Sequence, residues 1–285
     1  MSIAEFIGAD APTNQRTVEG SVYYAGDRVK RPRYFANDKS RDELDLRLHE
    51  VTVVDGRDGP APGLAAEGFA LVAAPTAVRN FRDDAEVDAV YAREVREIVA
   101  RATGAALVLN TGKGVLRFAE GSPESGALNN SLPARFIHND VSEPTARGFA
   151  QRALDARGEQ LSDYAGFAYY NVWRPITPPP QDVPLAMLDT RTLDWDDLIE
   201  ADAVFDVVGK PDFSFEGFLV RPNPAHRWVY FPQMAADEAV MFTTFGYRDG
   251  TPICVPHTGF DDPSVPPGTH PRASIEMRAL AFFKE

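Results

Sequence analysis

Short runs of alternating hydrophobic and polar residues, separated by turn residues, fill the second half of the chain. Alternation with a period of two is typical of strands that bury one face. We expect strands at 168–172, 185–188, 215–220, 228–231, 239–245, 252–255 and 272–283. Together with a strand that carries His138, these runs predict a jelly roll, in which two antiparallel sheets face each other and leave an open mouth between them.

The first half of the chain has a mixed pattern. Strands are expected at 51–54, 68–72 and 105–109. Between the last two strands, apolar residues recur at helical spacing. Asp83 or Asp84 can cap this helix, and Gly104 ends it. A second helix is expected at 142–156.

These elements predict a single mainly β (α+β) domain over residues 1–285. Residues 1–20 are polar and predict an N-terminal arm, 21–120 an α/β lead-in, and 130–285 the core. The core is a double-stranded β-helix, that is, a cupin-like jelly roll, with helices flanking it. The 23 prolines and 21 glycines fit many short strands joined by tight turns and exclude a helical bundle.

Charge and composition narrow the range of partners. The chain has 42 acidic and 29 basic side chains and a net charge of -13, so it would repel nucleic acid and anionic membranes. It shows no secretory signal and no apolar run of membrane-spanning length, which predicts a cytoplasmic protein. The single cysteine, Cys254, excludes an internal disulfide, and we expect it to be a small hydrophobic side chain rather than a nucleophile.

Candidate chemistry begins with a histidine that has a carboxylate two residues on. Of the five histidines, only His138 has this neighbour, in Asp140. On a strand, residues i and i+2 project from one face, so the two side chains can converge on one metal ion. The third ligand must come from elsewhere, and His226 and His257 are the main candidates. Two histidines and one carboxylate are typical of iron sites that leave positions open for a co-substrate and dioxygen.

The last predicted strand carries polar side chains on one face. Alternation places Arg272, Ser274, Glu276 and Arg278 together on that face. An arginine fork and a serine hydroxyl suit a carboxylate such as the distal one of 2-oxoglutarate. A solvent-exposed face, with Glu276 paired to either arginine, is the alternative that the pattern leaves open.

These features occur together in a family that the chain resembles. It comprises non-heme iron oxygenase-like proteins, among them a CmcJ-like component of cephamycin 7α-hydroxylation and fungal gibberellin desaturase-like and asaB-type hydroxylase/desaturases. The resemblance covers roughly residues 50–283. It rests on GF at 68–69, YAREV at 91–95, TGA at 103–105, HND at 138–140, NVWRP at 171–175, PLA at 184–186, HRWVYF at 226–231, DE at 237–238, PHTGF at 256–260 and RASIEMR at 272–278.

The resemblance implies which histidine completes the metal site. In iron oxygenases built on a jelly roll, an acidic turn and a strand precede the distal histidine, and the co-substrate arginine begins the next strand. Here Asp237 and Glu238 precede His257, and Arg272 follows it. His257 is therefore the implied third ligand. His226 comes before the acidic turn and is expected to be a hydrogen-bonded structural histidine.

The resemblance further implies an Fe(II)- and 2-oxoglutarate-dependent dioxygenase that uses O2, with ascorbate as reductant in vitro. The expected metal ligands are His138, Asp140 and His257, the expected co-substrate contacts are Arg272, Ser274 and Arg278, and the expected substrate contacts are Tyr169, Asn171 and Arg174. The substrate is expected to be a small molecule of secondary metabolism. Hydroxylation, desaturation and cyclisation stay open, because all three begin with removal of a hydrogen atom.

Two other functions remain compatible with the residues. A zinc hydrolase can use the same three ligands and an activated water. The chain can also be a non-catalytic jelly-roll binding protein, or a helper of a methyltransferase, since one relative of this family works beside such an enzyme. A methyltransferase is therefore a candidate partner.

Overall fold

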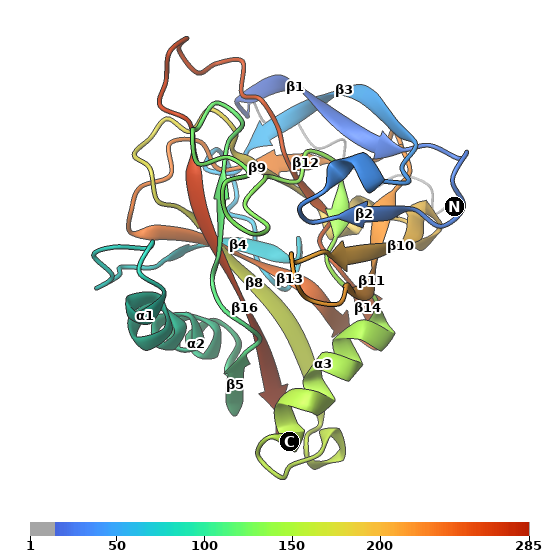
Figure 1. Cartoon of the computed structure of the whole chain (residues 1–285), viewed down its shortest axis with the longest axis vertical. Helices are drawn as coiled ribbons and strands as arrows, with labels where there is room; N and C mark the ends of the chain where they lie inside the picture. Colours follow the sequence, from blue (N-terminus) through green and yellow to red (C-terminus); the bar gives the residue numbers. More distant parts are fainter. Residues whose placement is uncertain (1–14, 285) are drawn as a thin grey trace, which may run out of the picture.

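The computed structural model describes residues 15–284 and consists mainly of β-strands, as predicted (Figure 1). Two sheets form a jelly roll. They share an apolar core in which Trp173 and Phe242 of one sheet pack with Met187 and Val229 of the other. The core arises because alternate residues of each strand point toward the facing sheet.

The larger sheet has nine strands, which come from both the first and the second half of the chain. In spatial order they are β1 (Thr17–Ala25), β3 (Leu46–Asp55), β12 (Trp228–Tyr230), β9 (Leu185–Leu188), β15 (His257–Gly259), β7 (His138–Asn139), β11 (Phe213–Val220), β10 (Leu198–Phe205) and β2 (Arg33–Phe35). The two short strands β7 and β15 lie side by side near the middle of this order, which is where two of the predicted metal ligands fall.

The smaller sheet has seven strands and includes the longest strands of the molecule. Its main path is β14 (Thr251–Ile253), β13 (Glu238–Arg248), β8 (Gly166–Pro175), β16 (Ala273–Phe283) and β5 (Leu107–Asn110), with β4 (Phe69–Ala73) paired to β13 and β6 (Val115–Phe118) paired to β16. Strands of the predicted lead-in therefore extend both sheets of the predicted core.

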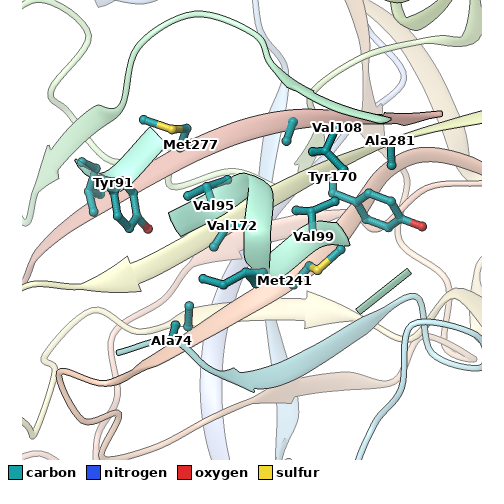
Figure 2. Packing of buried hydrophobic residues seen from close by; sticks show 14 of the residues in the cluster. Ala74, Tyr91, Val95, Val99, Val108, Tyr170, Val172, Met241, Met277 and Ala281 are labelled. Carbon is teal, nitrogen blue, oxygen red and sulfur yellow. The ribbon is translucent and has the colours of Figure 1, made fainter. Parts of the chain in front are cut away.

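A helical segment covers the outer face of the smaller sheet. It begins at α1 (Asp84–Glu86), where Asp83 caps the first turn, and continues through a π-helical turn (Val87–Tyr91) into α2 (Ala92–Thr103). Figure 2 shows Val95 and Val99 of α2 packed over the sheet. The sheet contributes Val172 from β8, Met241 from β13 and Met277 from β16 to this cluster.

The second helix, α3 (Glu143–Asp155), directly follows the strand with His138. Its apolar face, which includes Ala150 and Leu154, packs on the ends of β8 and β16. Four short 3-10 turns complete the elements: Lys39–Arg41, Leu161–Asp163, Thr190–Thr192 and Trp195–Asp197. None of the helices in the described part of the chain is long and apolar enough to cross a membrane.

The sequence pattern missed several short or irregular strands. β1 begins at Thr17, so the last residues of the predicted arm belong to a strand, while residues 1–14 of the arm lie outside the described part. The strands β2, β6 and β10 were not expected. The acidic stretch 194–197 makes one 3-10 turn and leads into β10. β2 and β6, with three and four residues, carry too few alternating positions to be recognised.

Candidate metal centre

His138 and His257 face each other across neighbouring strands of the nine-stranded sheet. They are directly opposite in the pairing of β7 with β15, and their ring centroids lie 4.4 Å apart. Asp140 follows β7, and its Oδ1 lies 3.8 Å from His138 Nε2. One ligand atom from each of the three residues lies within 4.8 Å of the others. The three side chains are buried, so the structure brings together the ligands that the sequence predicts.

The ring nitrogens of the two histidines are oriented for metal binding. His138 Nδ1 lies 3.0 Å from the carbonyl oxygen of Phe136, and His257 Nδ1 lies 3.1 Å from that of Val255. A carbonyl only accepts hydrogen bonds, so Nδ1 carries the proton and the Nε2 lone pair is free for a metal. Burial, helped by the nearby His257, lowers the pKa of His138 to about 4 and keeps its imidazole neutral.

Asp140 is held by two side chains from the opposite sheet. Arg278 Nη2 donates to its Oδ1 at 2.9 Å, and Asn171 Nδ2 donates to its Oδ2 at 3.4 Å. Asn171 and Arg278 are paired in the register of β8 with β16, which places both donors in one row. Burial raises the pKa of Asp140, but Arg278 and the two histidines outweigh it and hold the pKa below its usual range. The carboxylate is therefore charged and fixed in place.

A glycine allows the backbone next to Asp140 to lie close to β11. A Cβ atom at Gly217 would lie 2.6 Å from the carbonyl oxygens of Asn139 and Asp140. Any side chain at this position would push the metal-ligating segment away from its neighbour strand. Gly217 therefore helps to position Asp140, a role that the sequence pattern did not indicate.

A cavity beside the two histidines contains an arginine without a charged partner. His138, His257, Trp173 and Arg272 line it. Arg272 is 3% exposed, hydrogen-bonds to the Ser274 hydroxyl and stacks over the Trp173 ring at 5.7 Å. Its Nε has no partner and it forms no ion pair with the described residues. Burial lowers its pKa to about 10. An unpaired buried guanidinium is costly unless an anion binds to it.

Glu276 and Arg117 complete the polar wall of this cavity. Glu276 accepts from Arg278 Nη2 at 2.9 Å, and Arg117 Nη2 lies 3.5 Å from the same carboxylate. Arg117 Nη1 also donates to the carbonyl oxygens of Asn130 and Leu132 at 2.9 and 3.0 Å. Arg117 was not singled out in the sequence. Its one signal is a charged residue within the apolar run from 115 to 118.

The polar face of β16 points inward, and its two arginines have different surroundings. Arg272, Ser274 and Glu276 are buried, which rules out the alternative of a solvent-exposed face. Arg278 was expected to contact the co-substrate together with Arg272. Its guanidinium instead pairs with Asp140 and Glu276, so it supports the metal ligand.

The side chains of the three predicted substrate contacts bond to other protein groups. Asn171 binds Asp140, as described above. The Tyr169 hydroxyl hydrogen-bonds to Thr111, and its ring packs against Phe149 in the core. Arg174 donates to main-chain carbonyls on the outer face of the sheet. Arg174 lies on the face of β8 that points away from the metal centre. Tyr169 and Asn171 lie on the inner face, but their hydrogen-bond partners are Thr111 and the proposed metal ligand Asp140, so we assign none of the three residues to the substrate.

A variant of Arg174 tests whether this residue is structural rather than part of the substrate site. Its guanidinium donates to the carbonyl oxygens of Ala74 and Ala236 and lies 5.7 Å from the Phe81 and Tyr91 rings. Replacing it by methionine leaves buried carbonyls without a donor, so we expect the free energy of unfolding to fall by about 1–3 kcal/mol. The affinities for Fe(II) and 2-oxoglutarate should stay unchanged, as measured by titration beside a denaturation curve. A variant of normal stability with altered turnover would return Arg174 to the site.

His226 is a structural histidine, as the sequence predicts. Its Nδ1 lies 3.0 Å from the Tyr24 hydroxyl, and its Nε2 lies 3.1 Å from Asp197 Oδ2. Trp228 Nε1 donates to the same hydroxyl at 2.9 Å. These contacts occupy both ring nitrogens. Cys254 is also buried, and burial raises the pKa of its thiol to about 12, which agrees with the hydrophobic role that the sequence predicts.

Comparison with known proteins supports an oxidoreductase. Residues 22–282 match the family model described as "Oxidoreductase/YMDC permease-like domain". The chain belongs to this family. It is 28% identical to alpha-ketoglutarate-dependent dioxygenase phiK of Fungal sp. over 254 residues, which cover 85% of this chain and 86% of the relative. It is 27% identical to Fe(II)/2-oxoglutarate-dependent dioxygenase nvfI of Aspergillus novofumigatus over 85% of this chain and 79% of the relative.

A solved structure agrees with these relatives. The iron and alpha-ketoglutarate-dependent endoperoxidase NvfI superposes with a TM-score of 0.80 and 25% identity, over 94% of this chain and 99% of that chain. The chain is thus an Fe(II)- and 2-oxoglutarate-dependent oxygenase with a jelly-roll core, as its resemblance implied. Its cofactors are Fe(II), 2-oxoglutarate and O2.

Proposed function

We propose that His138, Asp140 and His257 bind the catalytic Fe(II), and that Arg272 with Ser274 binds the distal carboxylate of 2-oxoglutarate. The observation that supports this assignment is the cavity that joins both groups. The two histidines line one part of it, and the unpaired guanidinium of Arg272 lies in the same wall. A dicarboxylate can therefore reach the metal with one end and the arginine with the other.

The residues fit these cofactors chemically. Two neutral imidazoles and one carboxylate are the donor set of iron sites that keep open positions. The unpartnered Nε of Arg272 needs an acceptor, and a carboxylate supplies two oxygens to a guanidinium fork. Bound Fe(II), 2-oxoglutarate and O2 supply the oxidative decarboxylation of 2-oxoglutarate to succinate, coupled to oxidation of a C–H bond.

The protein contributes positioning and exclusion of water. The bonds from Nδ1 to main-chain carbonyls fix both imidazole planes, and Arg278 and Asn171 fix the Asp140 carboxylate. Phe242 packs against His257 with ring centroids 4.6 Å apart. Such apolar walls keep bulk water from the metal side of the cavity and strengthen the interaction of Arg272 with an anion.

The substrate that we propose is a small molecule of secondary metabolism, which the enzyme hydroxylates, desaturates or cyclises. Relatives named hydroxylase/desaturase and an endoperoxidase neighbour support this range of outcomes. A zinc hydrolase is disfavoured, because it has no use for the unpaired Arg272. A methyltransferase partner stays a prediction from the family resemblance.

We expect the purified protein to convert 2-oxoglutarate to succinate when Fe(II), ascorbate and O2 are supplied, slowly even without substrate. The reason is that the metal and co-substrate sites are complete within this chain. Succinate is measured by chromatography, and binding of Fe(II) is measured separately under nitrogen. Absence of succinate and of Fe(II) binding, together with zinc-supported hydrolysis of a simple ester, would overturn the proposal in favour of a hydrolase.

A further inference from the structure

A second cavity reaches the metal centre. Its walls include His138 and Asp140, whereas the cavity with Arg272 includes His138 and His257. The two cavities share Arg117, Pro133, Ala134 and His138. A ligand in the second cavity can therefore approach the metal without contacting Arg272.

Aromatic side chains form much of the second cavity. Tyr34 and Phe136 meet edge to face with ring centroids 5.1 Å apart, and Phe205 stacks on Phe215 at 5.1 Å. Phe213 extends this aromatic surface outward, because it lies 5.9 Å from Phe215 and is 52% exposed. Aromatic walls of this kind favour flat, ring-bearing ligands with a large apolar surface.

The buried charges of this cavity are already paired. Arg278 bonds to Asp140 and Glu276 at 2.9 Å each, and Arg117 bonds to two main-chain carbonyls and Glu276. At the mouth, Lys39 is exposed to solvent, and an exposed charge binds an anion only weakly. Asp42, also in the wall, accepts a hydrogen bond from the Phe35 N–H. The Nε of Arg278 has no partner, but the guanidinium is already paired with two carboxylates, whereas Arg272 in the first cavity has no ion pair among the described residues.

The hydroxyl of Tyr34, in the wall of this cavity, is free to bind a ligand. It forms no hydrogen bond with any residue from 15 to 284. Burial raises its pKa, and the negative charge of Asp140 adds to this, while Arg278 and Arg117 act in the opposite direction. The hydroxyl thus stays protonated near the metal centre and is able to donate a hydrogen bond.

We propose that the second cavity binds the substrate as an uncharged, ring-bearing metabolite, and that the Tyr34 hydroxyl donates a hydrogen bond to an oxygen atom of it. This rests on the proposed function, since it assigns the first cavity to 2-oxoglutarate. Tyr34 is then a residue that determines specificity: it orients the substrate through one polar contact, while the aromatic walls bind its apolar body.

The test uses three probes of nearly equal shape: 2-acetylnaphthalene, its hydrocarbon analogue 2-isopropenylnaphthalene, and the anion 2-naphthoate. Binding is measured by equilibrium dialysis under nitrogen, on protein loaded with Fe(II) and saturating 2-oxoglutarate. We expect the ketone to bind at least about tenfold more tightly than the anion, because the cavity offers no partner for a buried carboxylate. Equal or tighter binding of 2-naphthoate overturns the assignment of an uncharged substrate.

Two variants locate the probe. Tyr34→Phe should weaken the ketone about fivefold, the equivalent of one hydrogen bond, and leave the hydrocarbon analogue unchanged. Ala36→Trp, which fills the cavity, should weaken both probes at least about tenfold. Circular dichroism checks that each variant is folded. If Tyr34→Phe changes the binding of the ketone and the hydrocarbon equally, the hydroxyl does not bond to the probe. If a folded Ala36→Trp variant binds both probes as before, the ligand lies outside this cavity. Either result overturns the proposal.

The 2-oxoglutarate affinity of the same variants separates this inference from the proposed function. Both variants should bind 2-oxoglutarate as the unmodified protein does, because neither residue lines the first cavity. If the unmodified protein fails to bind 2-oxoglutarate, the proposed function is wrong, while the probe experiment repeated without co-substrate still tests the second cavity.

Discussion

Replacing His257 by alanine is expected to abolish Fe(II) binding and turnover while the protein stays folded. His257 is one of the three proposed ligands, and only its Nδ1 bonds to the main chain, which leaves Nε2 for the metal. The two remaining side chains should bind a divalent ion poorly, because a site that keeps positions open for the co-substrate and O2 has only three protein ligands to begin with. Metal content after dialysis and the circular dichroism spectrum are the measurements.

His226→Ala is the matched control for this prediction. His226 bonds to Tyr24 and Asp197 and does not belong to the group of proposed metal ligands. Its loss should lower the free energy of unfolding by about 1–3 kcal/mol, with Fe(II) still bound. Loss of iron from the His226 variant and its retention by the His257 variant would disprove the ligand set.

Replacing Arg272 by alanine should raise the concentration of 2-oxoglutarate needed for half-saturation by tens to thousands of times. Truncating one member of a buried, hydrogen-bonded charge pair typically costs about 2–5 kcal/mol. Stability should not fall in parallel, because Arg272 forms no ion pair with the described residues and its burial is unfavourable without a ligand. Titration of 2-oxoglutarate at saturating Fe(II), with a thermal unfolding curve, measures both effects.

Arg278→Ala provides the comparison, since Arg278 lies on the same face of β16. Its guanidinium bonds to Asp140, so its loss should weaken Fe(II) binding about 10–100-fold. At saturating Fe(II), the affinity for 2-oxoglutarate should change far less than in the Arg272 variant. An equal or larger loss of 2-oxoglutarate affinity would make Arg278 the anchor of the co-substrate, as the sequence alone allowed.

Local patterns in the sequence were sufficient to predict which site residues share a face when those residues lie within one strand. His138 and Asp140 share a face because they are two residues apart, and the same rule turned Arg272, Ser274 and Glu276 inward. The strand period likewise gave the mainly β class. These features depend on backbone geometry over a few residues, which does not change with the surroundings.

The resemblance to a family supplied what spacing could not. Neither periodicity nor composition separates His257 from His226, since each precedes or follows apolar strands. The order of the acidic turn, the histidine and Arg272 favoured His257, and the structure places it opposite His138 in the sheet. The same order favoured Arg272 as the co-substrate arginine but left Arg278 as a second expected contact.

Only the tertiary structure decided which partner each inward side chain meets. Arg278 binds Asp140 across 138 positions of the chain, and Asn171 reaches it across 31. Such pairs depend on how two sheets are stacked and on the register of their strands. A shift of the register by one residue would turn each side chain to the opposite face of the sheet. The sequence by itself therefore determined a jelly roll with a His-x-Asp strand and an inward arginine face. The packing of the sheets determined that Arg272 has no ion pair among the described residues, that Arg278 bonds to Asp140, and that a second, aromatic cavity lies beside the metal centre. These features depend on contacts between segments that are distant in the sequence.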